Sequence, residues 1–103
     1  MIRKTYTKTG RTCRVTFKLA ASEALEAERV HVLGDFNDWS PEATPLTARK
    51  NGAFSTTASL EAGPSYRFRY LLDGERWLSD AAADAQVPNG LGDLDSVVET
   101  ARV

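Results

Sequence analysis

Apolar and polar residues alternate with a period of two along most of this chain, in short runs separated by turn signals. In the clearest run, residues 66–72, large apolar side chains occupy every second position: Tyr66, Phe68, Tyr70 and Leu72. A strand with one buried face requires this alternation. Arg69 lies between two of these positions, so we expect its side chain to point away from the core.

Weaker or shorter runs lie at residues 15–19, 30–32, 54–60 and 97–98. Two turn dipeptides, Asn51-Gly52 and Asp73-Gly74, favour hairpins, because both central residues of a type I′ turn need a positive φ. Pro88-Asn89-Gly90 is a further turn signal. Residues 22–28 and 81–86 are the only helical candidates, and both are too short to organise a fold. About six to eight short strands at roughly ten-residue spacing predict an all-β fold, an antiparallel β-sandwich.

The chain has 103 residues, of which 42% are hydrophobic, and this is the usual size of one compact domain. We therefore expect residues 1–103 to form a single domain. The net charge of −1 gives no electrostatic case for nucleic acid or an anionic membrane as a partner. Neither a signal-like segment nor a membrane-spanning apolar run is present, so a cytoplasmic location is expected. Cys13 is the only cysteine, which excludes an internal disulfide and suits a small buried side chain.

Charge is nevertheless unevenly distributed. The first part of the chain carries six basic residues before the first acid, Glu23, and the part from Asp73 onward is mostly acidic. The six are Arg3, Lys4, Lys8, Arg11, Arg14 and Lys18. We expect the exposed faces of two neighbouring strands to pair these charges. The alternative is a basic strip that docks a partner.

Both tryptophans follow turn signals. Trp39 comes after a Gly/Asp/Asn cluster at residues 34–38, and Trp77 comes after Asp73-Gly74. Loops at these places can present the indoles to solvent. A flat apolar face beside hydrogen-bonding groups suits a sugar ring, which has C–H groups on its faces and hydroxyls on its rim. The alternative for each tryptophan is a packing role in the sandwich.

Several ordered motifs resemble carbohydrate-binding module family 48, the early-set domain of isoamylases, glycogen branching enzymes and the β subunit of AMP-activated protein kinase. The resemblance covers about residues 30–98. Its motifs are Gly-Asp-Phe-Asn-Asp-Trp-Ser-Pro at 34–41, Pro-Leu-Thr at 45–47, Leu-Glu-Ala-Gly at 60–63, the run at 66–74, Trp77, Asp80, and Gly-Asp-Leu-Asp-Ser-Val-Val at 92–98. The resemblance implies an immunoglobulin-like sandwich that binds α-1,4-glucans such as glycogen, starch or maltooligosaccharides.

The same resemblance implies roles for individual residues. Trp39 and Trp77 would stack on successive glucose rings, and Arg69, in place of a familiar Lys, would donate to sugar hydroxyls. Leu91 would insert against the concave side of the glucan. Asp95 stands where glucan-binding members often have an Asn, and Asp93 is nearby. A plain structural role is the alternative for each, including a solvated strand position for Arg69.

The sequence gives little support for a catalytic function. Asp35, Asp38, Asp73 and Glu75 lie in turn signals where solvent and backbone capping explain them, and His31 is the sole histidine. No metal-ligand spacing is present, although Asp93-x-Asp95 as a calcium site is a remote alternative, and no cofactor is expected.

Three hypotheses follow for the function. We favour a non-catalytic α-glucan binder, with a glycogen-metabolising enzyme as a candidate partner. The second hypothesis is a protein-interaction sandwich without sugar binding. The third is a glycosidase or branching activity, or an accessory domain of such an enzyme.

Overall fold

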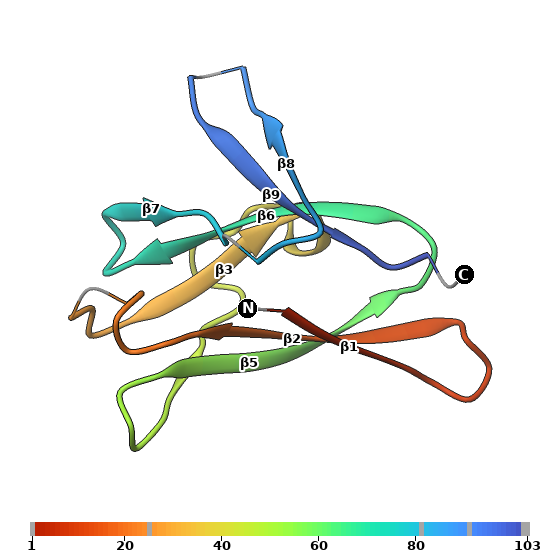
Figure 1. Cartoon of the computed structure of the whole chain (residues 1–103), viewed down its shortest axis with the longest axis horizontal. Coiled ribbons are helices and arrows are strands. Elements are labelled where there is room, and N and C mark those ends of the chain that lie inside the picture. Colours follow the sequence, from red (N-terminus) through yellow and green to blue (C-terminus); the bar gives the residue numbers. More distant parts are fainter. Residues whose placement is uncertain (1, 25, 81, 91, 102–103) are drawn as a thin grey trace.

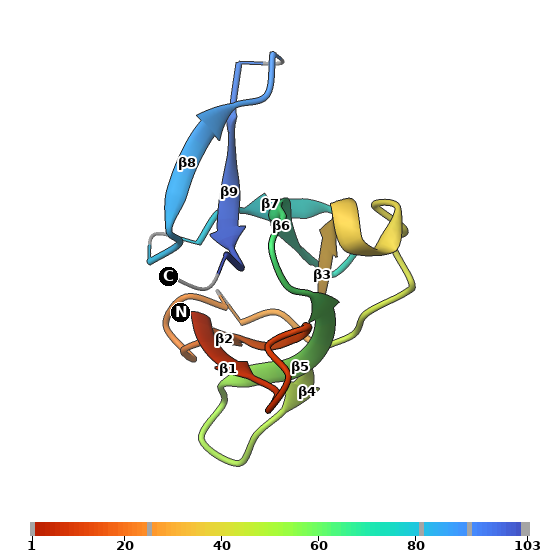
Figure 2. The same cartoon turned by 90° about the vertical axis from the view of Figure 1, so that its right-hand side faces the viewer.

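Two antiparallel sheets pack face to face in the computed structural model, which describes residues 2–24, 26–80, 82–90 and 92–101 (Figures 1 and 2). The first sheet has the order β1-β2-β5-β4, and the second has the order β3-β6-β9-β8 with β7 also on β6. The strands are β1 (Ile2–Tyr6), β2 (Thr12–Leu19), β3 (Val30–Gly34), β4 (Thr47–Ala48), β5 (Phe54–Glu61), β6 (Ser65–Leu72), β7 (Arg76–Leu78), β8 (Ala85–Pro88) and β9 (Leu94–Glu99). The expected all-β, immunoglobulin-like sandwich is confirmed.

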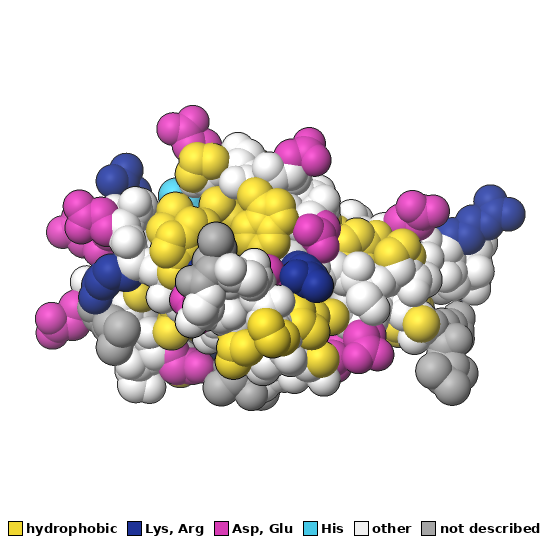
Figure 3. Space-filling view, turned by 90° about the horizontal axis from the view of Figure 1, so that it is seen from above, with side chains coloured by type: hydrophobic (Ala, Val, Ile, Leu, Met, Phe, Trp, Pro, Cys, Tyr) yellow, Lys and Arg dark blue, Asp and Glu magenta, His cyan; other side chains and the backbone are white. Residues whose placement is uncertain are grey.

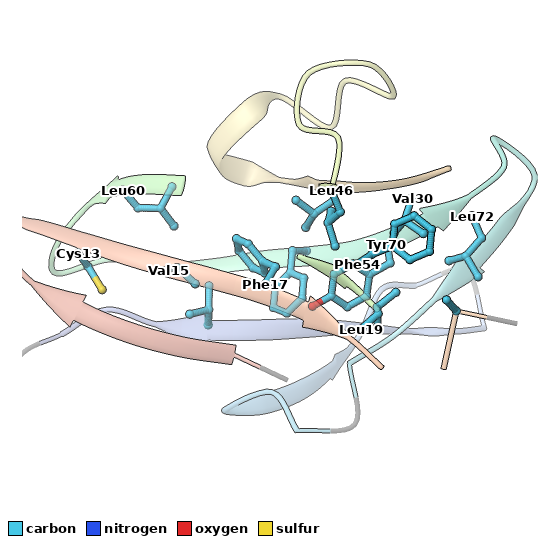
Figure 4. Close-up of a cluster of buried hydrophobic side chains, with 14 residues drawn as sticks. Cys13, Val15, Phe17, Leu19, Val30, Leu46, Phe54, Leu60, Tyr70 and Leu72 are labelled. Atoms are coloured by element: carbon cyan, nitrogen blue, oxygen red, sulfur yellow. The ribbon is translucent and has the colours of Figure 1, made fainter. Parts of the chain in front are cut away.

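Alternation along β2 shows why the sheets close on each other. Four inward side chains of this strand are fully buried: Cys13, Val15, Phe17 and Leu19. They meet the inward residues of β6, among which Phe68 and Tyr70 are equally buried (Figure 4). The period-two patterns at residues 15–19 and 66–72 therefore gave the correct inward faces.

An aromatic cluster extends the core toward one loop. Phe17 packs edge-on against Phe68 with ring centroids 5.0 Å apart, and it stacks on Phe36 at 5.5 Å. Phe36 belongs to the short 3-10 helix η1 (Asp35–Asn37), which follows β3. Because stacked aromatic pairs hold a defined geometry, this contact fixes the loop that leads to Trp39.

The turn prediction is correct for Asp73-Gly74, and for Asn51-Gly52 it is correct only for the glycine. Asp73 and Gly74 have φ values of 53° and 71°, the signs that a type I′ turn needs. Gly52 has a φ of 85°, but Asn51 is not among the described residues with positive φ. The reason is a longer loop, in which Arg49 donates its backbone N–H to Ala53 at 2.7 Å.

The helix expected at residues 22–28 is wrong, because its described residues 22–24 and 26–28 form turns and bends. Backbone N–H groups of Glu23 and Ala24 both donate to the carbonyl of Ala20, which closes isolated turns only. The second helical candidate is wrong as well, since Ala85 and Gln86 begin β8; residues 25 and 81 lie outside the described residues. No helical segment in the described ranges combines the length and hydropathy needed to cross a bilayer.

The expected charge pairing between neighbouring strands is not found at three of the basic positions. Arg3 lies opposite Thr16, Arg14 lies between Thr5 and Ser59, and Lys18 lies opposite Ser55. The register thus places hydroxyls beside these cations. Lys4 does meet an acid, but that acid is Asp84, which precedes β8 of the other sheet, at 2.8 Å.

Candidate functional site

A groove of about 340 Å³ lies on the second sheet, on the side away from the first sheet. It is lined by Trp39, Arg69, Trp77, Asn89 and Asp95. Figure 3 views this side of the molecule and shows apolar side chains gathered near its middle, with charged groups between them. Both indoles therefore border one groove, although they are far apart in the sequence.

Strand pairing explains how these residues come together. One side of β6 pairs with β3, while the other side pairs with β9 through residues 65–68 and with β7 through residues 70–72. Arg69 occupies the junction between β9 and β7 on that shared side. Trp77 on β7 and Asp95 on β9 consequently flank the same position of β6.

Trp39 is held by a compact loop. Its backbone N–H donates to the carbonyl of Gly34 at 3.0 Å, and its indole Nε1 donates to Oδ1 of Asp35 at 3.0 Å. Asp38 and Trp39 both have a φ of 56°, in the left-handed region that non-glycine residues seldom adopt. Two consecutive left-handed residues reverse the chain after η1 and carry the indole to the groove.

Gly34 and Asn37 explain why the loop has this shape. A Cβ on Gly34 would lie 2.5 Å from the carbonyl oxygen of Arg67 and 2.6 Å from Cε2 of Phe36, so a side chain has no room there. Asn37 accepts from the N–H of Gly34 at 3.0 Å through Oδ1 and donates to the carbonyl of Val32 at 2.9 Å through Nδ2. The amide side chain of Asn37 thus ties the loop to β3.

Asp35 was not predicted as a residue of the site. Its carboxylate connects the loop of Trp39 to strand β6. Besides the bond to Trp39, Oδ2 accepts a 2.8 Å hydrogen bond from the backbone N–H of Arg67 on β6. The sequence signal was the four-residue spacing between Asp35 and Trp39, but the partner on β6 follows only from the sheet topology. Asp35 therefore positions the indole without lining the groove.

Trp77 is the more open of the two indoles, with 46% of the residue exposed. It pairs with Leu71 across β6 and β7, and the guanidinium carbon of Arg69 lies 5.0 Å from the centroid of its ring. A cation over an indole face at this distance is attracted by the ring quadrupole. The exposure excludes a core-plugging role for Trp77.

Arg69 points away from the core, as expected, but its side chain is only 12% exposed. The alternative of an ordinary solvated strand residue is therefore wrong. One terminal nitrogen lies 2.6 Å from Oδ2 of Asp93, which fixes the guanidinium beside Trp77. Nε of Arg69 is buried and has no hydrogen-bond partner among the described residues.

The two acids of the predicted site occupy different positions. Asp93 is 56% exposed at its side chain and reaches the groove only through Arg69. The backbone N–H of Leu94 and, secondly, the charge of Arg69 lower the pKa of Asp93 below its ordinary value. Asp95 lines the groove, has a side chain 10% exposed, and lies 3.8 Å from the nearest guanidinium nitrogen of Arg67.

Asn89 is a lining residue that sequence reasoning missed, because it was read only as part of a turn. Its Nδ2 donates to Oδ1 of Asp95 at 3.4 Å, and its backbone N–H donates to the carbonyl of Asp93 at 3.1 Å. These contacts place an amide on the wall of the groove. Leu91, which was predicted to contact ligand, lies outside the described residues.

Two of the four acids considered for catalysis, Asp73 and Asp35, have structural partners. Asp73 accepts from the backbone N–H groups of Glu28 at 2.8 Å and Arg29 at 2.9 Å, and the bond from Arg29 is the largest influence that lowers its pKa. Asp35 has the two bonds described above. Within the described ranges, no three His, Cys, Asp or Glu side chains gather as a metal site would require.

The groove combines two kinds of recognition. Indole faces of Trp39 and Trp77 offer apolar stacking surfaces, while Arg69 and Asn89 supply N–H donors and Asp95 supplies a carboxylate acceptor. Such a lining suits a ligand with flat apolar faces and hydroxyls at its edges.

A protein-family model matches most of the chain. The model of a family described as the glycogen recognition site of AMP-activated protein kinase matches residues 21–101 of the 103-residue chain. A comparison with curated proteins found no match. The family match begins before β3 and ends after β9, so it includes every described residue of the groove.

Proposed function

This chain belongs to the family of the glycogen recognition site of AMP-activated protein kinase, and from that membership we propose that it binds α-1,4-glucans without catalysing their conversion. Glycogen, starch and maltooligosaccharides are the proposed ligands. The residues proposed to form the binding site are Trp39, Arg69, Trp77, Leu91, Asp93 and Asp95, to which the groove geometry adds Asn89.

One observation carries this proposal: Trp39, in the loop that follows β3, and Trp77, on β7, border the same groove. Arg69 lies on β6, between β3 and β7. Successive glucose units of an α-1,4 chain are turned relative to one another, so a curved chain meets two separate aromatic faces better than one flat platform. Each indole is proposed to stack on one glucose ring.

Polar groups between the indoles would fix the orientation of the chain. Arg69 donates to glucose hydroxyls in this proposal, and Asp95 accepts from them, because a carboxylate has no hydrogen to donate. Asp93 acts by holding the guanidinium of Arg69 in place. A single shallow groove with few contacts is expected to bind weakly, with a dissociation constant on the order of micromolar to millimolar.

The decisive experiment is a titration with maltoheptaose, followed by tryptophan fluorescence and by amide NMR. We expect quenching and shifts confined to residues of the groove, and both should be smaller in Trp39→Ala at the same concentration of maltoheptaose. Cellohexaose, whose glucose units are joined by β-1,4 bonds, is the matched control ligand and should produce neither change. Unchanged spectra at millimolar maltoheptaose would contradict glucan binding and favour the protein-interaction hypothesis.

The absence of catalysis and the accompanying enzyme need separate tests. Incubation with amylopectin should release no reducing ends and leave the branch distribution unchanged. If the chain localises a glycogen-metabolising enzyme, a complex of the two should sediment with glycogen, and Trp39→Ala should release the complex. An increase in reducing ends would contradict the non-catalytic proposal while leaving glucan binding intact.

A further inference from the structure

We propose that the opposite sheet carries a second ligand site, for a small phosphate ester with at least two phosphoryl groups. A groove of about 550 Å³, larger than the one that contains the tryptophans, lies over β1, β2, β5 and the turn after β4. This volume is in the range of pockets that hold small molecules, which is about 300–1,000 Å³. The groove shares no lining residue with the one that contains the tryptophans.

Basic and neutral hydrogen-bonding side chains dominate the lining. The cations are Arg3, Lys18 and Arg49, and the neutral polar groups are Thr16, Asn51 and Ser55. No carboxylate lines this groove in the described part of the chain. The positive potential over the groove is therefore not neutralised by an acid in its wall, which favours an anionic ligand.

Strand register explains how the cations and hydroxyls came together. Arg3 on β1 lies opposite Thr16 on β2, and Lys18 on β2 lies opposite Ser55 on β5. Hydroxyl groups thus occupy the cross-strand positions at which acidic side chains would neutralise the cations. Hydroxyl groups can donate to phosphate oxygens in addition to the charged groups.

Arg49 is oriented before any ligand binds. Its Nε donates to Oγ of Ser55 at 2.8 Å, and the loop around it is closed by the 2.7 Å bond from its own backbone N–H to Ala53. A guanidinium held through one nitrogen loses less conformational freedom when its other nitrogens bind an anion. The planar fork of arginine also matches the geometry of a phosphate group.

The separation of the two arginines indicates more than one anionic group. Arg3 belongs to the first strand of the sheet order and Arg49 follows the last, so three strand spacings, on the order of 14 Å, separate their backbones. A molecule with two or more phosphoryl groups can contact both guanidinium groups without requiring the two long side chains to converge on one phosphate. Ile2 and Ala53 add apolar wall for the organic part of the ligand.

The test uses isothermal titration calorimetry and amide NMR on the whole chain with three probes: ADP, inorganic tripolyphosphate and adenosine. We expect ADP and tripolyphosphate to shift resonances of the groove, while uncharged adenosine shifts none. The double variant Arg3→Gln with Arg49→Gln should lose affinity for ADP by about tenfold or more, because two charge-assisted contacts are removed.

A matched double variant, Arg11→Gln with Arg14→Gln, removes two positive charges that do not line the groove and should change ADP affinity by less than about twofold. Maltoheptaose affinity should be unchanged in both doubles, which separates this proposal from glucan binding. An equal loss of ADP affinity in the two double variants would show only general charge attraction and would overturn the proposed site. Binding of an acidic peptide without binding of ADP or tripolyphosphate would overturn it in favour of a protein-docking face.

Discussion

The indole Nε1 of Trp39 donates a 3.0 Å hydrogen bond to Oδ1 of Asp35. Through its other oxygen, the same carboxylate accepts from the backbone N–H of Arg67 on β6. The ring is therefore tied to the sheet by a residue that does not line the groove. Its orientation depends on a carboxylate with two acceptors, which gives a first prediction.

Asp35→Ala is expected to weaken maltoheptaose binding by about three- to tenfold, because the indole loses the hydrogen bond that orients it. Asp35→Asn should show a smaller loss, since one amide oxygen can replace one of the two carboxylate acceptors. Calorimetry with maltoheptaose measures both variants. Equal affinity of Asp35→Ala and the wild type would show that the bond does not position Trp39.

Removal of either indole should weaken glucan binding by about 1–3 kcal/mol, by analogy with the stacking of nucleic-acid bases on aromatic rings. Trp77→Ala and Trp39→Ala are compared by titration with maltoheptaose. Trp39→Phe keeps a ring and leaves Trp77 as the only tryptophan, so quenching of tryptophan emission in that variant reports on Trp77 alone. Retention of full affinity in Trp77→Ala would remove the second indole from the proposed site.

Arg69 and Asp93 make a prediction about pH. The pKa of Asp93 is lowered from 3.8 by the backbone N–H of Leu94 and then by Arg69, so Arg69→Gln should raise it part of the way back. Because the folded pKa is below the unfolded one, the contribution to stability is present above pH 3.8 and is lost as pH falls through the folded pKa. Carboxyl NMR titration measures this pKa.

Arg76→Gln is the matched control, since Arg76 contacts Asp73 at 3.4 Å but the pKa of Asp73 is lowered mainly by a backbone bond from Arg29. The pKa of Asp73 should change little in that variant. A change at Asp73 as large as the change at Asp93 would contradict this ranking of causes.

A buried polar network predicts a cost in stability. The hydroxyl of Tyr70, fully buried, donates to Oδ2 of Asp80 at 2.8 Å, and Asp80 is itself 1% exposed. Tyr70→Phe leaves that oxygen without this donor and should lower the free energy of unfolding by about 1–3 kcal/mol. Urea unfolding is the measurement. Tyr66→Phe, at a half-buried position, is the control and should cost less.

The expectation of one domain over residues 1–103 also becomes a measurement. Unfolding followed by far-ultraviolet circular dichroism and by tryptophan fluorescence should give coincident single transitions, as small single domains usually do. Trp77 lies on β7 of the second sheet and Trp39 lies in the loop that follows β3 of that sheet, while circular dichroism reports on both sheets. Two separated transitions would contradict a single cooperative unit.

Local patterns predicted the buried faces because alternation reports directly on which side of a strand is apolar. Tyr66 to Leu72 and Val15 to Leu19 carried enough signal for that. The junction at Arg69 could not be predicted in this way, because it depends on β7 and β9 sharing one side of β6. The contact between Asp35 and Arg67 likewise joins residues brought together only by the fold.

Predictions that failed did so for similar reasons. Charge pairing around Arg3 was expected from the sequence of one segment, whereas the partner in the sheet, Thr16, is set by register. The helix at residues 22–28 was inferred from Glu, Ala and Leu, whose helix propensity is high but did not prevail in a connection between the sheets too short to sustain a helix. Asn89 was overlooked because a turn signal in the sequence does not show which turn residues the folded chain places on the wall of a groove.

The two grooves lie on opposite outer faces of the sandwich. A copy resting with its indoles on the surface of a glycogen particle would turn its cationic side toward the surrounding solution. Soluble metabolites could then reach that side while the polysaccharide stays bound, and neither ligand would obstruct the binding of the other.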